Sequence, residues 1–79
     1  MQPANVPNGN GEPLLANARV AAVMCSTSLR TWRSWDAAAS IPAAIRIGRV
    51  KYWRPRELED WVAAGCPARA QWNWEPRSR

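Results

Sequence analysis

The sequence has no histidine and only two cysteines, which removes the commonest ligands and bases of metal and catalytic sites. Cys25 and Cys66 lie too far apart for a Cys-x-x-Cys motif, and without histidine they cannot complete a zinc site. We expect Cys25 to be a small buried residue and Cys66 to lie in a turn. The pattern contains no paired nucleophile and base. We therefore predict a protein that is not an enzyme and uses no metal or other cofactor.

Long apolar runs are also absent. No stretch approaches the roughly 20 apolar residues that a membrane span needs, and the N-terminus lacks the basic and apolar regions of a secretion signal. No segment joins a Lys/Arg face to a broad apolar face, so the sequence does not favour a membrane partner. These absences predict a cytoplasmic protein with reduced thiols.

Acidic residues are scarce relative to basic ones. The sequence contains eleven Lys and Arg residues and six Asp and Glu residues, which gives a formal net charge of +5. The excess is concentrated between Arg30 and Arg56, which includes seven basic residues and one acid, Asp36. A basic balance of this kind predicts a polyanionic partner, nucleic acid before any other. At 79 residues the chain allows one domain with a thin core.

Composition divides the chain into three parts. Residues 1–13 are rich in Pro, Gly and Asn and predict a disordered arm. Residues 14–67 predict the folded domain, with Leu14 and Leu15 as an extended lead-in packed onto the core. Residues 68–79 predict a partly ordered tail in which Trp72, with Trp74 as a second candidate, docks on the core.

Two short helices are predicted in the first half of the domain. Asn17 is a good N-cap for a helix over 18–25, and Ser28 is a good N-cap for a helix over 29–38. Ser26 and Thr27 form the turn between them. A tight turn before a capped basic helix is typical of a helix-turn-helix.

A hairpin and a third helix follow. Residues 45–47 alternate apolar and basic side chains as a half-buried strand does, Gly48 and Arg49 form a tight turn, and residues 50–53 return as a second strand. Pro55 suits the first turn of the third helix, and Gly65 is the expected residue just beyond its end.

The predicted core lies on one face of each element. The inward residues are Ala18, Ala21, Ala22, Cys25, Leu29, Trp32, Trp35, Leu58, Trp61 and Val62. In the second strand Trp53 is favoured inward, but Val50 and Tyr52 point inward if the register slips by one residue. The six tryptophans could also stack on single-stranded nucleic acid, yet a domain this small needs large side chains in its centre, which favours the core. The predicted fold class is mainly α: a three-helix winged helix-turn-helix with a two-stranded β-hairpin wing.

Three stretches carry a family resemblance: SerLeuArgThr at Ser28, IleArgIleGlyArg at Ile45, and GluLeu with the later Trp and AlaGlyCysPro in the third helix. Residues 14–67 resemble the AlpA-like and excisionase-like small helix-turn-helix family, related to the MerR-type winged DNA-binding domain. The resemblance implies DNA binding through the second helix and the wing. The residues that match the recognition helix are Ser28, Leu29, Arg30, Thr31, Arg33 and Ser34, and those that match the wing are Arg46, Gly48, Arg49 and Lys51.

The sequence departs from the family pattern in places. Ser26 and Ala39 stand where glycine is usual, and Lys51 stands where an apolar wing residue is usual. Trp32 replaces a smaller apolar residue, and Ala44 stands where proline is common. Ala39 therefore suggests an altered exit from the second helix, and Lys51 leaves the register of the wing open.

The basic residues divide into two predicted roles. Arg30 and Arg33 are three apart on one helix face, and an arginine there can bond guanine O6 and N7 together. Arg30 is the first candidate for base readout, while Thr31 and Ser34 suit a base or phosphate contact as well as a plain helix surface. The candidates for phosphate contacts are Arg46, Arg49, Lys51 and, at the end of the ribbon, Arg54.

These features predict a double-stranded DNA-binding protein, a small prophage-type transcriptional regulator associated with the nucleoid. The alternative in the same class is an excisionase that bends attachment-site DNA for an integrase. A rival from another class is an interaction adaptor that docks a protein through helix 3 or the tryptophan-bearing tail. Further predicted partners on DNA are a second copy or an integrase, and no small-molecule ligand is predicted.

Overall fold

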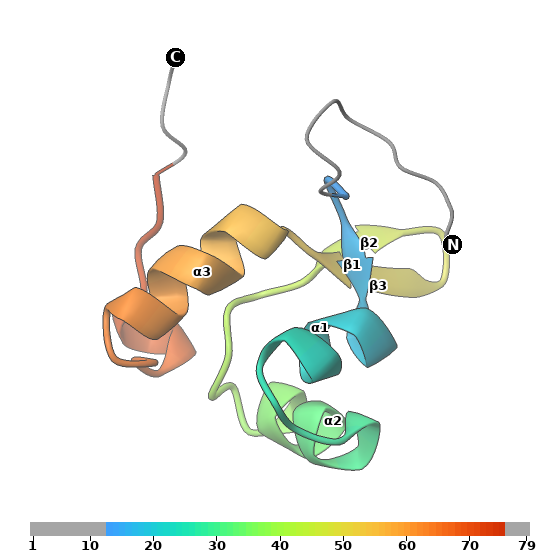
Figure 1. The fold of residues 1–79 in the computed structure, drawn as a ribbon, viewed down its shortest axis with the longest axis horizontal. Helices are drawn as coiled ribbons and strands as arrows, with labels where there is room; N and C mark the ends of the chain where they lie inside the picture. The colour runs from blue at the N-terminus through green and yellow to red at the C-terminus, as the bar shows by residue number, and fades with distance from the viewer. Residues whose placement is uncertain (1–12, 76–79) are drawn as a thin grey trace.

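The computed structural model describes residues 13–75, and the predicted arm lies almost entirely outside that range. The elements in order are β1 (Ala16–Asn17), α1 (Ala18–Met24), α2 (Leu29–Ala37), β2 (Ile45–Ile47), β3 (Val50–Trp53), α3 (Pro55–Ala63) and the 3-10 helix η1 (Arg69–Gln71). Three helices pack beside a small sheet, with α1 and α2 next to each other and α3 following directly after the last strand (Figure 1). Among these residues there is no helix with the length and apolar character needed to cross a bilayer.

The sheet has three antiparallel strands in the order β1-β3-β2, so the predicted fold class needs correction. The helices and the β2–β3 hairpin lie where they were predicted, but the architecture is mixed α/β and the hairpin is not a free two-stranded wing. β1 pairs with β3 through Ala16 opposite Trp53 and Asn17 opposite Tyr52. The sequence did not predict β1 because two residues that lead directly into a helix show no alternation.

The helix starts follow from their caps. The Asn17 Oδ1 atom accepts a hydrogen bond from the Val20 backbone N–H at 2.9 Å, and Ser28 Oγ accepts one from Thr31 at 3.0 Å. Both predicted caps are confirmed. Pro55 occupies the first turn of α3, where its missing N–H leaves no bond unmade.

All three helices end in the same way, in a left-handed residue followed by a backbone bond back to the last turn. Gly65 takes this position after α3 at φ +95°, but Ser26 at +60° and Ala39 at +58° take it after α1 and α2. After α2 the Ser40 N–H donates to the Trp35 carbonyl at 2.9 Å, which is the Schellman pattern. The exit from α2 thus keeps the usual geometry at a steric cost, because a Cβ is unfavourable in this region.

Tryptophan side chains from three elements meet at the centre. Trp32 of α2 is fully buried and makes edge-to-face contacts with Trp53 of β3 at 5.5 Å and with Trp61 of α3 at 6.5 Å between ring centroids. The indole N–H groups of Trp53 and Trp61 donate to the carbonyls of Pro42 and Pro67 at 2.9 and 2.8 Å. These rings therefore fill the core, as predicted, and are not available for stacking on a ligand.

Several side chains predicted to lie inward are exposed instead. Trp35 and Val62 lie at the rim of the core, and Leu14 and Leu15 do not anchor it. Ala16 is buried in their place, since it faces Trp53 across the sheet. A small residue fits there because the indole ring opposite already fills the space.

The tail covers the acidic side of α3. Trp72 packs against the core, as predicted, and its Nε1–H donates to Glu57 Oε2 at 3.0 Å. Trp74 donates to Asp60 Oδ2 at 2.8 Å. Glu57 is consequently buried.

The isoleucines of β2 do not lie on the side of the hairpin that faces the core, although their alternation with arginine suggested that they would. Trp53 points inward, which confirms the favoured register. Residues that face each other on neighbouring strands share a side of the sheet, so Arg46 lies on the same side as Lys51, and Ile47 on the same side as Val50. The isoleucine side of β2 therefore faces away from the helices, and its basic side faces toward them.

Candidate nucleic-acid interface

The outer face of α2 carries its exposed polar side chains. Arg30, Arg33 and Ser34 are exposed, and they lie on the side of the helix away from buried Trp32. Thr31 and Leu29 are half-buried. Two arginines, one near the start of the helix and one a turn later, thus project from a helix held against the core by a tryptophan.

Ser28 and Thr31 use their side chains mainly to build the helix start. Besides its bond from the Thr31 N–H, the Ser28 hydroxyl donates to Thr31 Oγ1 at 3.0 Å. Their hydroxyls fix the position from which Arg30 leaves the backbone. Of the six residues matched to a recognition helix, Ser28, Arg30, Arg33 and Ser34 are exposed, and the hydroxyl of Ser28 is engaged in the cap.

The tip of the β2–β3 hairpin is a two-residue turn that depends on glycine. Gly48 has φ +65°, whereas Arg49 is not among the positive-φ residues, a combination that fits a type II′ turn. No atom lies within 4 Å of a Cβ built on Gly48, so the backbone angle rather than lack of space requires glycine. The turn places Arg49 at the far end of the hairpin.

A cleft of about 470 Å³ lies between α2 and the β2–β3 hairpin. Arg33 lines it from α2, Arg49 and Lys51 from the hairpin, and Arg69 from the 3-10 helix η1, with Asp36 the only acid. Residues separated by 16 positions in sequence, Arg33 and Arg49, thus face one cavity. Arg46 lies on the same side of the hairpin as Lys51 but is not part of the lining.

Asp36 ties the parts of this cleft together. Its Oδ2 atom lies 2.7 Å from Lys51 Nζ, and its Oδ1 atom lies 2.7 Å from the Arg69 guanidinium. Burial acts to raise the pKa of Asp36, but the hydrogen bonds and charges of Lys51 and Arg69 outweigh it and lower the pKa below its ordinary value. The carboxylate therefore stays ionised and fixes α2, β3 and the tail relative to one another.

Sequence reasoning did not select Arg69. Besides the Asp36 pair, its Nε–H donates to the Ile41 carbonyl at 3.0 Å, and its backbone N–H donates to the Ala39 carbonyl. Residue 69 lies in the tail, 33 positions from Asp36. In the sequence, Asp36 is conspicuous as the one acid between Arg30 and Arg56, but this gives no indication that residue 69 is its partner.

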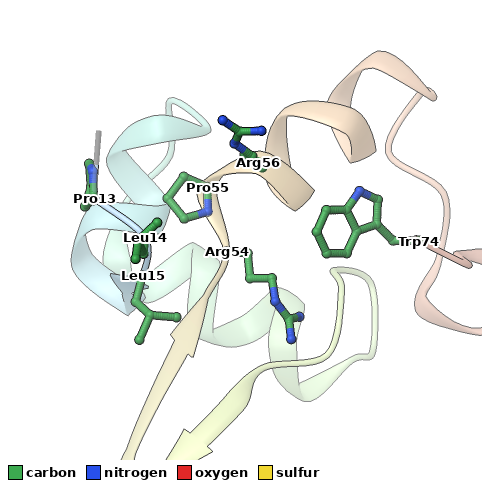
Figure 2. Close-up of a pocket in the computed structure, with 7 residues that line it drawn as sticks. All are labelled: Pro13, Leu14, Leu15, Arg54, Pro55, Arg56 and Trp74. Atoms are coloured by element: carbon green, nitrogen blue, oxygen red, sulfur yellow. The ribbon is translucent and has the colours of Figure 1, made fainter. Parts of the chain in front are cut away.

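Arg54 does not join the other predicted wing residues. It lies on the opposite side of the hairpin, 3.4 Å from Glu57, and its guanidinium stacks over the Trp74 ring at 5.5 Å from the centroid. It lines a separate pocket together with Leu15 and Arg56 (Figure 2).

The two thiols lie on one shallow groove away from the cleft. Cys25 is half-buried and Cys66 is exposed, and both are reduced. Burial, together with the proximity of Cys66, raises the pKa of the Cys25 thiol. Within residues 13–75 no three His, Cys, Asp or Glu side chains come together as metal ligands.

Comparisons with protein-family models, with curated proteins and with solved structures found no match to this chain. The resemblance to the AlpA-like and excisionase-like family stays a prediction from the sequence.

Proposed function

We propose that this protein binds double-stranded DNA as a small transcriptional regulator in the nucleoid, with α2 in the major groove and the wing on a neighbouring phosphate backbone. One observation carries the proposal: a single cleft between helix and hairpin is lined by four cationic side chains and one acid. The acid is already paired with Lys51 and Arg69. The net charge that the cleft offers to a ligand is therefore positive.

The uncommitted cations support this assignment. Among the residues that the structure describes, no carboxylate forms an ion pair with Arg30, Arg33, Arg46 or Arg49. Unpaired arginines on a helix and on a hairpin tip suit duplex DNA, because different elements of one protein commonly contact the base edges and the phosphates.

The roles of the arginines follow from their positions. Arg30 leaves the first turn of α2, the part of a recognition helix that most often reaches base edges, so we assign it base readout. Arg33 lines the cleft beside Arg49, and both suit the phosphates at the groove edge. Lys51 contributes less to the affinity for DNA than the arginines do, because a contact with DNA competes with its ion pair to Asp36.

The test is selection from a random duplex pool with the wild type, Arg30→Ala and Arg49→Ala, and with Arg19→Ala, an exposed arginine on α1, as the matched control. We expect the wild type to enrich a motif and Arg30→Ala to lose about 1–3 kcal/mol of discrimination at one position. Arg49→Ala should weaken all sequences alike and lower the salt slope by about 1.

Arg19→Ala should enrich the wild-type motif. If no motif emerges and the Arg30 and Arg49 variants behave like Arg19→Ala, the basic residues serve solubility and the proposal is wrong.

A further inference from the structure

The outer face of the sheet is apolar and uncovered among the described residues. Ile47 and Val50 face each other beside the turn and are 52% and 46% exposed. Ile45 and Tyr52 form the next pair along the hairpin and are half-buried. All four lie on the side opposite Trp53, so the helices that cover the inner face leave this one open.

This surface continues past the end of the hairpin. β1 lies beside β3, and Leu15, the residue before β1, lines a pocket of about 340 Å³ with Arg54, Arg56 and Trp74 (Figure 2). Leu14 and Pro55 add to the same lining. The exposed apolar residues therefore run as a strip from the hairpin tip to the start of α3, and apolar surface of this kind with a polar rim is typical of interaction sites.

The charged residues that line the pocket end of the strip, Arg54 and Arg56, are both basic. The strands themselves contain no acidic residue. Glu57 is buried and bonded to Arg54 and Trp72, and the Asp60 carboxylate is bonded to Trp74. A complementary partner is therefore apolar along the strip and negatively charged where it meets Arg54 and Arg56.

We infer that the outer face of the sheet is a docking site for an acidic amphipathic helix of another protein. A helix suits the site because a sheet buries an apolar face by packing a further element against it, and helices cover sheets in mixed folds. Its apolar stripe lies across Ile47, Val50 and Leu15. Its acidic residues lie against Arg54 and Arg56.

This site is separate from the proposed DNA surface. Neighbouring side chains along a strand alternate between faces, so Ile47 and Val50 point away from the side that carries Arg46 and Lys51. A helix on the outer face leaves the cleft between Arg33 and Arg49 open. The same hairpin can therefore hold duplex DNA on one side and a protein on the other.

The test uses labelled synthetic helices of about 15 residues, the length at which such peptides begin to be helical. One has a leucine stripe and glutamate flanks. The second carries lysine in place of glutamate, and the third carries serine in place of leucine. Fluorescence anisotropy measures their binding to the wild type, to the double variant Ile47→Ser/Val50→Ser, and to Arg56→Gln. Val23→Ser, an exposed apolar position on α1, is the matched control.

We expect the leucine–glutamate peptide to bind the wild type and Val23→Ser equally, and the double variant roughly tenfold or more weakly. Arg56→Gln should weaken it several-fold. The inference would be overturned if the serine peptide bound as tightly as the leucine–glutamate peptide, or if the double variant bound the peptide as tightly as the wild type. Binding would then depend on charge alone. Dimers of the wild type in sedimentation that the double variant abolishes would also overturn it, in favour of a second copy.

Discussion

The two faces of the β2–β3 hairpin are built from the same seven residues and have opposite surroundings. On the inner face Trp53 is buried against Trp32, and Lys51 reaches Asp36 on α2. On the outer face Ile47 and Val50 are exposed. The contrast shows that alternation along a strand identifies two faces but does not say which one a protein buries.

Specific contacts of Trp53 distinguish the two faces. Its ring packs edge-to-face against Trp32, and its indole N–H donates to the Pro42 carbonyl, so this side of the hairpin is held against the core. The basic residues Arg46 and Lys51 can lie on the inner side because this part of the hairpin extends beyond the core. There Lys51 forms an ion pair with Asp36. The same geometry exposes an apolar strip behind the charged cleft.

The largest effect should come from truncating the buried side. Trp53→Ala should lower the free energy of unfolding by about 3–5 kcal/mol, a loss that can unfold a domain of this size. Val50→Ala on the outer face should cost less than about 1 kcal/mol. Urea denaturation followed by circular dichroism measures both, and similar losses for the two variants would show that the faces are not distinguished as described.

Asp36→Asn tests the ion pairs that join the inner face to α2. It should cost about 1–2 kcal/mol at neutral pH, because Lys51 and Arg69 lose their partner. The pKa of Asp36 is lowered in the folded protein, so its contribution is fully present above its ordinary pKa of 3.8 and is lost as pH falls through the folded value.

Wild-type stability should therefore decline more steeply below about pH 4 than that of Asp36→Asn. Glu59→Gln, an exposed position on α3, provides the control. The account of Asp36 is wrong if its variant keeps the wild-type acid slope.

Ala39→Gly should change the stability of the protein without altering either face of the β2–β3 hairpin. Ala39 has φ +58° after α2, where a Cβ costs about 1–2 kcal/mol and glycine costs less, so the variant should be more stable by about 1 kcal/mol. Thermal unfolding should show the gain, with DNA binding unchanged. A destabilised variant would mean that the Ala39 methyl group contributes contacts worth more than the strain.

Ile47→Thr should have the smallest effect on folding. Its side chain is half exposed and the substitution keeps a β-branched residue, so stability should change by no more than about 0.5 kcal/mol. DNA affinity should also stay the same, while binding of the acidic peptide should fall. A loss of DNA affinity would place the outer face in the DNA interface instead.

Local signals in the sequence predicted most of the fold. Asn17 and Ser28 as caps, the turn at Gly48 and the end of α3 at Gly65 all depend on a residue's own backbone chemistry, and the structure confirms them. The DNA-binding role of the residues on α2 and the wing stays a prediction, although the structure brings Arg33, Arg49 and Lys51 to one cleft.

What the sequence could not predict depends on distant partners. Arg69 meets Asp36 across 33 positions, and β1 exists only because Ala16 can pair with Trp53. Arg54 was grouped with the wing by its place in sequence, but alternation and its contact with Trp74 put it on the opposite side.

The most direct test of the two-faced hairpin is a pair of NMR titrations of the isotope-labelled protein, first with the selected duplex and then with the acidic peptide. The account predicts that the duplex shifts the signals of Arg30, Arg33 and Arg49, that the peptide shifts those of Leu15, Ile47 and Val50, and that both ligands bind at once. Shifts of one shared set of residues, or competition between the two ligands, would contradict it.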